Sequence, residues 1–481
     1  MNIMNIKSII HSFKKQVEDE ETNKKEDVTL SGWVRTVRSS SANLTFCVIN
    51  DGSNVNGLQV ILTNEIMDLA KKSLFEKEVK TGAYIKCIGK LVKSPGEKQV
   101  CEMQLHDYEL SGKVDSFYPL AKSKMNLDTL RQYIHFRPRT NVFGSVFRIR
   151  SKLMKAIHDF YHHLDFHHID PNIITINECE GGAGVFQLTE KDISKKENLE
   201  YSKEGDYKWL SDHFNDPVYL TVSSQLQLEI FACGLGNCYT VNKSFRSEHS
   251  NTNKHASEFT HLEIEMINNN LDDLMNIGEQ TIKYCIERIC MDCSEDIDNL
   301  DAFISKGLKE RLSCLLNKPF IKKTYQEVIE EINIDINNKV IDLPELTVGD
   351  DLGSKHEDYI TQKYNNGVFV THWPLAIKSF YMKKCIENDN CESFDLLLPF
   401  GIGEIIGASQ REDNYDQLLK QMDAKGIMKE KMGFYIDLRK YGSCPHGGFG
   451  LGFERLLMLM TGMKNIRDVL PIPVCYKDCK Y

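Results

Sequence analysis

The feature that most constrains the fold is a series of short segments, between Val28 and about Leu110, in which apolar and polar residues alternate. Successive side chains of a β-strand point to opposite faces, so each segment predicts a strand with one buried face. Turn residues such as Asp51-Gly52 separate the segments, and one helical pattern lies between the third and the fourth. The sequence therefore predicts about five strands and one helix in this region.

Five short strands in about 85 residues fit a small closed barrel of the OB type, which commonly binds single-stranded nucleic acid on one face. A barrel with a structural or protein-binding role fits the same strand count. At 481 residues the chain needs further domains. Helical patterns such as 270–289 mix with apolar strands beyond the barrel, which predicts an α+β domain.

We therefore expect four parts along the chain. They are a frayed, solvated N-terminal extension (1–26), the barrel (27–110), a hinge with little periodicity (111–130) and one large α+β domain (131–481). Within the last part, the polar segment 191–210 predicts an excursion on the surface.

The composition excludes some classes of function. A formal net charge of −10 argues against non-specific coating of nucleic acid, although a local basic face stays open. No apolar run approaches the roughly 18 residues that cross a bilayer, and the first residues lack the apolar core of a secretory signal. We therefore expect a cytoplasmic protein with no membrane partner, whose 15 cysteines are reduced thiols. A structural zinc at Cys290 and Cys293 is the less favoured interpretation, because a second CxxC pair is missing.

The strongest functional signal is a polar loop between two apolar, strand-like runs. Arg246 stands at one edge of this loop and Phe259 at the other. An arginine can hold a phosphate with two hydrogen bonds, and an aromatic face can stack on a base. An ordinary hairpin with surface charges is the alternative.

A second signal is the glycine alternation from Gly447 to Gly452, which leads through Phe453 and Glu454 to Arg455 and an apolar helix. Small residues let the backbone approach a ligand closely, although tight packing alone would also explain them. The spacing fits neither a Rossmann motif nor a P-loop.

Taken together, these two elements match two of the three signature motifs of class II aminoacyl-tRNA synthetases. From about residue 28 to about residue 473 the chain resembles the class IIb group, and within it the asparaginyl enzymes. The loop FRSEHSNTNKHASEF is similar to their pattern FRAENSNTSRHLAEF. Further blocks resemble asparaginyl segments in the same order: VGDDLGSKHEDYI, FVTHWPLAIKSFYM, GIGEIIGASQRED, YGSCPHGGFGLGFERL and NIRDVLPIP.

The resemblance implies an OB anticodon domain joined to a catalytic domain with an antiparallel sheet flanked by helices. It implies ATP-dependent ligation of L-asparagine to tRNA(Asn) through an asparaginyl-adenylate, with Mg²⁺ and in a homodimer. Arg246 is expected to bridge the α-phosphate and the substrate carboxylate, Phe259 to stack on adenine, and Arg455 to hold the γ-phosphate. The remaining nucleotide-site residues that it implies are Glu248 and His255 on ATP, and Asp395 and Glu404 on magnesium. The stretch between these last two acids is one residue longer than in the family pattern.

The same resemblance implies how the amino acid is chosen. Aspartyl enzymes carry a lysine where this chain has Leu228, and Glu229 follows it here. We expect Glu229 to accept from the amide nitrogen of asparagine while Arg411 donates to its oxygen. An aspartate carboxylate would instead face Glu229, a like charge. An exposed helical Glu229 is the alternative reading.

Three further acidic or polar residues are expected in that pocket by resemblance: Glu180 and Glu263 on the α-ammonium group, and Gln225 in the lining. On the barrel, Phe46 is expected to stack the central anticodon base, Gln59 to read its edge, and Arg38 to hold phosphate or base.

Three alternatives remain open at this point. An aspartyl enzyme, discriminating or relaxed, is the nearest, and Leu228 argues against it. A paralog that amidates aspartate would have no use for the barrel. A catalytically silent paralog that binds RNA would be free to lose Arg246, Glu404 and Arg455.

Overall fold

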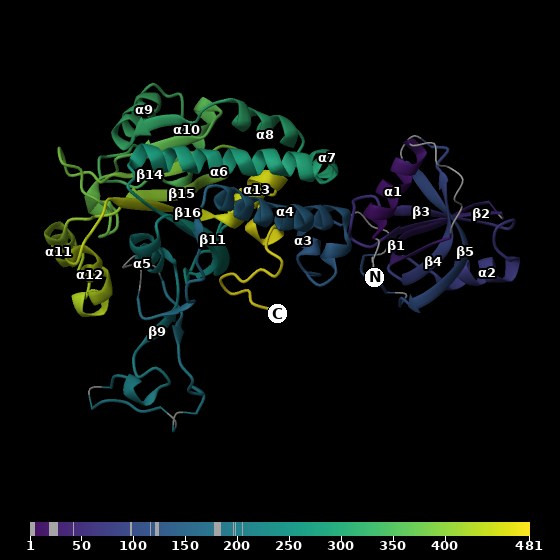
Figure 1. Cartoon of the computed structure of the whole chain (residues 1–481), viewed down its shortest axis with the longest axis horizontal. Coiled ribbons are helices and arrows are strands. Elements are labelled where there is room, and N and C mark those ends of the chain that lie inside the picture. The colour runs from purple at the N-terminus through teal and green to yellow at the C-terminus, as the bar shows by residue number, and fades with distance from the viewer. Residues whose placement is uncertain are drawn as a thin grey trace. The chain divides into compact units, whose positions relative to one another are not determined.

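A computed structural model describes residues 5–18, 27–41, 43–96, 99–115, 117–120, 125–177, 184–195, 197, 199–203 and 205–481. The chain divides into two compact units (Figure 1). The first comprises Met1–Arg148 and Cys293–Lys306, and the second Ile149–Asp292 and Gly307–Tyr481. Among the helices in the described ranges, none is long and apolar enough to cross a membrane. The α+β fold class is confirmed, whereas the domain boundaries at 26, 110 and 130 stay predictions.

The first unit contains the predicted barrel, closed in the order β1-β2-β3-β5-β4. Its strands are β1 (Val28–Ser41), β2 (Leu44–Asn50), β3 (Leu58–Thr63), β4 (Tyr84–Lys93) and β5 (Cys101–Gly112), with α2 (Leu69–Glu78) between β3 and β4. Burial alternates along β2 and β3, so that Cys47, Ile49, Val60 and Leu62 face the core. The period-2 pattern therefore encodes both the strands and their inner face.

The N-terminal helix α1 (Ile6–Glu18) corrects one expectation. Ile6 is fully buried and Ile9 is 3% exposed, and both belong to the hydrophobic core of the barrel. The Ile6 backbone N–H also donates to Asp51 Oδ2 over 2.8 Å. A frayed extension was thus the wrong prediction for these residues, because two isoleucines at helical spacing bury enough apolar surface to dock a short helix. Residues 1–4 and 19–26 lie outside the described ranges.

The second unit is built on an eight-stranded sheet in the order β12-β13-β14-β15-β16-β11-β10-β6. Its inner neighbours from β13 to β10 pair antiparallel, while β12 and β6 pair parallel at the edges. The strands are β6 (His167–His168), β10 (Cys238–Phe245), β11 (Glu258–Ile267), β12 (Ile321–Thr324), β13 (Val368–Thr371), β14 (Ser393–Leu398), β15 (Gly403–Gln410) and β16 (His446–Gly452).

Helices cover one face of this sheet, and further helices lie around its other face. Those over the core face include α4 (Asn141–His163), α6 (Leu271–Asp292) and α13 (Phe453–Thr461), and Figure 1 shows α6 running along β14, β15 and β16. The others in this unit are α5 (Gln225–Leu235), α8 (Leu308–Asn317), α9 (Tyr325–Asn337), α10 (Ser354–Tyr364), α11 (Tyr415–Ala424) and α12 (Gly433–Lys440). The first unit also holds α3 (Leu127–Leu130) and α7 (Ser294–Phe303).

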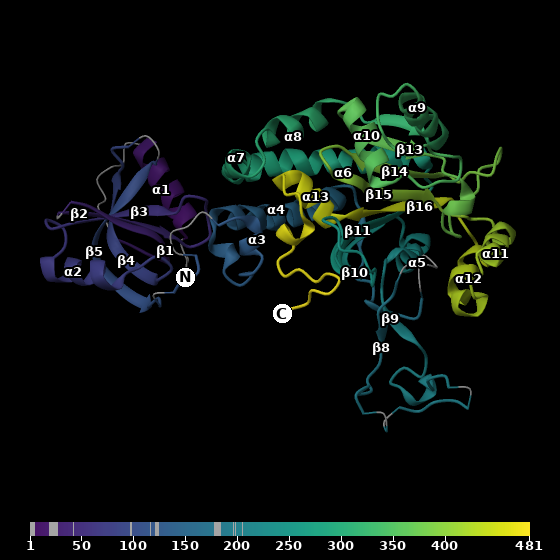
Figure 2. The same cartoon turned by 180° about the vertical axis from the view of Figure 1, so that it is seen from behind.

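A small sheet, β7-β9-β8, carries the excursion predicted at 191–210. Its strands are β7 (Ile174–Thr175), β8 (Gln187–Leu188) and β9 (Val218–Leu220). Figure 2 shows the chain between β8 and β9 extending away from the large sheet of the same unit.

The two faces of the large sheet differ in chemistry, and this difference positions the site. Leu262 and Ile264 on β11, Phe449 on β16 and Ile406 on β15 are buried, and Gly278 of α6 lies against the last two. On the opposite face, Glu263 lies between Leu262 and Ile264 along β11, and Gly448 and Gly450 flank Phe449 along β16.

Candidate active site

The polar face of β11 and β16 forms the floor of the site. On this face His261 lies opposite Gly452, Glu263 opposite Gly450, and Glu265 opposite Gly448. The glycines are required by close approach: a Cβ on Gly448 would lie 2.0 Å from the Ile264 carbonyl oxygen, and one on Gly450 would lie 2.8 Å from His261 Nε2. The alternation therefore leaves a groove between the side chains of β11 and those of β15.

All six residues predicted to bind ATP line one pocket on this face. They are Arg246, Glu248, His255, Phe259, Glu404 and Arg455. The structure thus brings together positions from the 246–259 loop, from β15 and from the first turn of α13. Their assigned roles remain predictions.

Backbone and carboxylate contacts hold the two arginines in place. The Arg246 N–H donates to the Ser257 carbonyl over 3.0 Å, which closes the base of the loop, and the Arg246 guanidinium lies 5.7 Å from the centre of the Phe259 ring. Glu454 is buried and accepts from the Thr260 N–H at 2.8 Å and from Arg150 at 2.9 Å. This fixes the start of α13, so that Arg455 reaches back to donate to the Glu404 carbonyl.

The electrostatics of the pocket favour an anion on one side. Burial and the neighbouring Arg455, Arg246 and Lys254 lower the pKa of His255, while Glu248 opposes them. His255 Nε2 lies 3.8 Å from Glu248 Oε2, and both side chains are more than a third exposed. A neutral imidazole beside three cations is suited to a strongly negative ligand.

The opposite side of the pocket gathers carboxylates. Both Asp395 and Glu404 flank Gly407, since a Cβ there would lie 3.3 Å from Glu404 Oε1 and 3.7 Å from Asp395 Oδ1. Glu357 of α10, which the sequence analysis missed, joins them and accepts from the Glu404 N–H at 3.3 Å. Burial and the charge of Glu404 raise the pKa of Glu357 to about 7.

Asp395 is also held by a buried lysine. Lys378 Nζ lies 2.7 Å from Asp395 Oδ2 and 4.0 Å from the centre of the Trp373 ring. Burial raises the pKa of Asp395 to about 6, with Glu404 adding to the rise and Lys378 opposing it. Three crowded carboxylates, Asp395, Glu404 and Glu357, offer the oxygen ligands that a hard divalent cation such as Mg²⁺ prefers.

The segment between Asp395 and Glu404, expected to be one residue longer than in the family pattern, contains a turn. Phe400 has φ 69° and is followed by Gly401 with φ 81°. A register shift lies between Leu396 and Leu397, yet Asp395 still pairs with Gly407. The longer segment therefore does not separate the two acids.

Glu229 lies at the centre of a buried cluster at the other end of the groove. Its carboxylate is fully buried and accepts from Arg439 Nη2 at 2.7 Å, from the Tyr435 hydroxyl at 3.0 Å and from Gln225 Nε2 at 3.1 Å. His446 Nε2 lies 2.9 Å away. Burial would raise the pKa of Glu229, but Arg439, His446 and Arg411 together hold it below its usual range.

Arg411 lies near Glu229 but contacts two other side chains more closely. Its Nε lies 3.9 Å from Glu229 Oε1 but 3.2 Å from Glu265 Oε1, and its Nη1 donates to Ser409 Oγ at 2.7 Å. Burial raises the pKa of Glu265 to about 7, against the opposing effect of Arg411. Glu229 and Arg411, both expected to contact the asparagine amide, thus belong to one network with Glu265 and Arg439.

Two further predicted residues of the amino-acid pocket, Gln225 and Glu263, meet at the start of α5. Gln225 is its first residue, and Glu263 accepts from the Ser224 N–H at 2.9 Å and from the Ser223 hydroxyl. Glu263 therefore anchors the helix that carries Glu229. Glu180 lies outside the described residues.

On the barrel, the three predicted anticodon residues share the outer face. Arg38 is directly opposite Phe46 across β1 and β2, and Gln59 is opposite Val48, two residues further along β2. Arg38 is exposed, and Gln59 Nε2 donates to Glu102 Oε2 at 3.1 Å. These contacts place an aromatic ring, a cation and an amide on one surface.

Two family models cover the chain. Residues 126–475 match the family described as tRNA synthetases class II (D, K and N), and residues 28–118 match the OB-fold nucleic acid binding domain. The chain belongs to the class II tRNA synthetases. The OB prediction for the barrel of this synthetase is confirmed as well.

Curated relatives and solved structures agree. The synthetase is 40% identical over 459 residues to an asparagine–tRNA ligase of Phocaeicola vulgatus, covering 94% of this chain and 96% of that protein. It is similar to the asparaginyl-tRNA synthetase of Pyrococcus horikoshii complexed with asparaginyl-adenylate, with a TM-score of 0.81, 28% identity and coverage of 94% and 95%. For the Entamoeba histolytica asparaginyl-tRNA synthetase with asparaginyl-adenylate the TM-score is 0.80, with 27% identity and coverage of 96% and 98%. The recognition made from sequence is confirmed.

The sequence analysis missed several residues of this synthetase. They are Glu265, Lys378, Glu357, Tyr435, Arg439 and His446. Alternation along β11 from Phe259 would have pointed to Glu265, whereas Arg439 and His446 stand 210 and 217 residues from Glu229 and carry no local signal.

Proposed function

We propose that the protein activates L-asparagine with ATP and transfers it to tRNA(Asn), releasing AMP and pyrophosphate. One observation carries this proposal. A pocket lined by all six predicted ATP residues and a buried cluster around Glu229 lie on the same face of the sheet. Relatives that are asparagine–tRNA ligases support it.

In this proposal the cationic side of the pocket binds the triphosphate. Arg246 holds the α-phosphate and the amino-acid carboxylate, Phe259 stacks on adenine, and Arg455 at the start of α13 holds the γ-phosphate. A carboxylate oxygen of asparagine then attacks the α-phosphorus and pyrophosphate leaves. No general base is needed, because the amino-acid carboxylate is already ionised at neutral pH.

The carboxylate side would hold Mg²⁺ through Glu404, Asp395 and Glu357. When bound, the ion neutralises charge that develops on the phosphate oxygens. Lys378 keeps Asp395 oriented toward Gly407 by its 2.7 Å contact.

Charge balance in the Glu229 cluster supports asparagine over aspartate. Glu229 and Glu265 are matched by Arg439 and Arg411, all within a few per cent of full burial. A neutral amide adds no charge to this balanced network. The side-chain carboxylate of aspartate would be a third carboxylate without a matching cation, because Leu228 stands where aspartyl enzymes carry lysine. The cost would be on the order of several kcal/mol.

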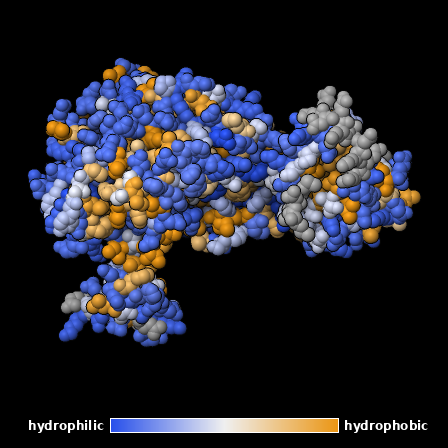
Figure 3. Space-filling view, viewed as in Figure 1, coloured by the Kyte–Doolittle hydropathy of each residue, from blue (hydrophilic) through white to orange (hydrophobic). Residues whose placement is uncertain are grey.

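For tRNA binding, we propose that Phe46, Gln59 and Arg38 read the central anticodon base on the barrel surface. We also propose that two chains form a homodimer. Ile173, Ile174, Ile176 and Phe186 near β7 and β8 are 37–45% exposed, and Figure 3 shows hydrophobic side chains gathered where this small sheet joins its unit. A symmetric partner would cover them. A cytoplasmic location stays a prediction from the sequence.

The test is the charging of tRNA(Asn) and tRNA(Asp) transcripts with asparagine and with aspartate. We expect stable aminoacylation only for asparagine on tRNA(Asn). Equal charging with aspartate would favour the relaxed aspartyl alternative, and no activation of either amino acid would favour the silent paralog.

A further inference from the structure

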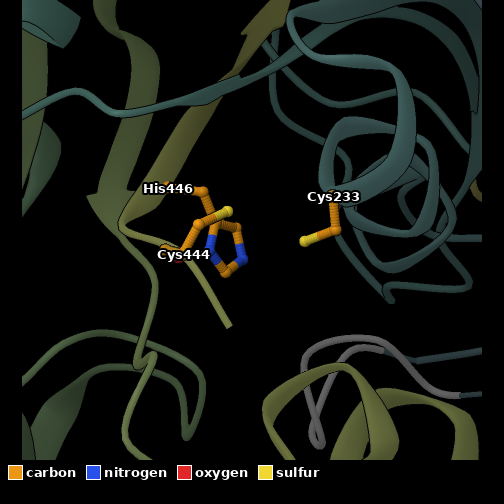
Figure 4. A group of neighbouring side chains, drawn as sticks. All are labelled: Cys233, Cys444 and His446. Atoms are coloured by element: carbon orange, nitrogen blue, oxygen red, sulfur yellow. Dashed lines mark hydrogen bonds between the residues drawn. The ribbon is translucent and has the colours of Figure 1, made fainter. Parts of the chain in front are cut away.

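Two thiols converge on His446 beside the Glu229 cluster. Cys233 lies on α5, and Cys444 stands two residues before His446, the first residue of β16. Figure 4 shows the Cys233 side chain reaching from its helix toward the other two. The two sulfur atoms and a ring nitrogen of His446 lie within 4.8 Å of one another. Both cysteines are partly exposed, whereas His446 is buried.

Such a set of side chains has two chemistries open to it, a disulfide or a metal site. A disulfide would join the two sulfurs alone, would need an external oxidant and would leave the converging ring of His446 without a role. A metal ion needs no preformed thiolate, because it displaces the thiol proton itself. Two sulfurs and one imidazole are also ligands that tetrahedral Zn²⁺ takes, with water in the fourth position.

We propose that Cys233, Cys444 and His446 form a binding site for a thiophilic divalent cation of the Zn²⁺ type. On binding, two S–H bonds break, two metal–sulfur bonds form, and two protons pass to solvent. The net charge of the site is therefore unchanged, which matters because Glu229 and Arg439 next to it are already paired. Mg²⁺ and Ca²⁺ prefer oxygen ligands and would displace no thiol protons, so the site discriminates against them.

Occupation of this site competes with the hydrogen bonds of His446. Its Nδ1 lies 2.8 Å from the Cys444 carbonyl oxygen, and its Nε2 lies 2.9 Å from Glu229 Oε2. A metal on either nitrogen removes one of these contacts and shifts the ring that supports Glu229. The cation should thus weaken amino-acid binding while leaving the ATP pocket in place, a consequence that rests on the proposed function.

The binding itself is tested with Co²⁺ on the reduced, metal-free full chain, because thiolate-bound Co²⁺ gives charge-transfer absorption. We expect one equivalent to bind with this signature, to be displaced by Zn²⁺, and to be lost in Cys233→Ala and in Cys444→Val. Cys290→Ala, which removes a thiol of the CxxC pair, is the matched control and should retain it. Each cysteine is changed separately, so a folding defect in one variant leaves the other to decide. Binding that persists in either folded variant, or no charge-transfer band in the wild type, would overturn the site.

The kinetic arm measures ATP–pyrophosphate exchange with and without stoichiometric Zn²⁺. The expected result is a KM for asparagine raised at least about tenfold, a KM for ATP changed less than about twofold, full recovery with a chelator, and resistance in Cys444→Val. A tenfold change corresponds to about 1.4 kcal/mol. A chain that binds Co²⁺ as predicted but activates no asparagine would overturn the proposed function and leave the metal site standing, whereas Zn²⁺ inhibition that persists unchanged in Cys444→Val would overturn the coupling to His446.

Discussion

The pocket lined by Arg246 and Arg455 and the cluster around Glu229 lie on the same sheet face but are built in opposite ways. In the pocket, Glu248 and His255 are more than a third exposed and lie 3.8 Å apart. In the cluster, Glu229 and Arg439 are fully buried and 2.7 Å apart. The charged groups of the pocket are partly exposed to solvent, whereas those of the cluster pair with one another in the interior. We infer from this contrast that partly exposed charged groups suit a charged ligand, whereas buried and paired charges suit a neutral side chain.

The largest effect is expected from breaking the cluster. Glu229→Gln leaves the Arg439 guanidinium buried without its counter-charge, which should cost about 3–5 kcal/mol of stability. Chemical denaturation of the variant and the wild type measures the difference. Glu287→Gln, on the exposed side of α6, is the control and should change the free energy of unfolding little. A loss no larger than that of the control would show that the cluster is not a balanced ion network.

Replacing an arginine of the pocket should have the opposite effect, a large loss of activity with little loss of stability. Arg455→Ala is expected to lower ATP–pyrophosphate exchange by about 10²–10³-fold, since it removes a charge that stabilises the phosphates, with little change in thermal stability. Arg288→Ala, at an exposed ion pair on α6, is the control. Exchange within threefold of the wild type would contradict the phosphate role.

A substitution on the barrel offers a sharper comparison, because it should affect the binding of tRNA alone. Phe46→Ala removes one stacking face, worth about 1–3 kcal/mol, and should raise the KM for tRNA about tenfold or more. Exchange without tRNA should stay at the wild-type rate. If both assays fell together, the ring would be a structural part of the barrel.

The smallest effect concerns Glu357 and depends on pH. The folded pKa of Glu357 is about 7, above its ordinary value of 4.5, so the folded chain keeps a proton that the unfolded chain has released. Ionisation between these values therefore destabilises the metal-free fold. Glu357→Gln should be more stable than the wild type by about 1–2 kcal/mol above about pH 7.5, and equal to it below about pH 4.5. A difference that is independent of pH would contradict the raised pKa.

The same contrast explains what could be predicted from sequence. Alternating segments reveal the barrel, and Arg246 and Phe259 come from one continuous loop, so local patterns suffice. The partners of Glu229 come from α12 and β16, far along the chain, and only the assembled sheet brings them together. The docking of α1 was missed because Ile6 and Ile9 give too short a pattern to separate a packed helix from a solvated one.

The most direct test of the account is the ratio of kcat/KM for ATP–pyrophosphate exchange with asparagine and with aspartate. A charge-balanced cluster predicts a ratio of at least about 10 in the wild type, since one like-charge contact costs more than about 1.4 kcal/mol. It also predicts that Leu228→Lys, which adds a cation beside Glu229, lowers that ratio. Equal rates with the two amino acids in the wild type would contradict the account.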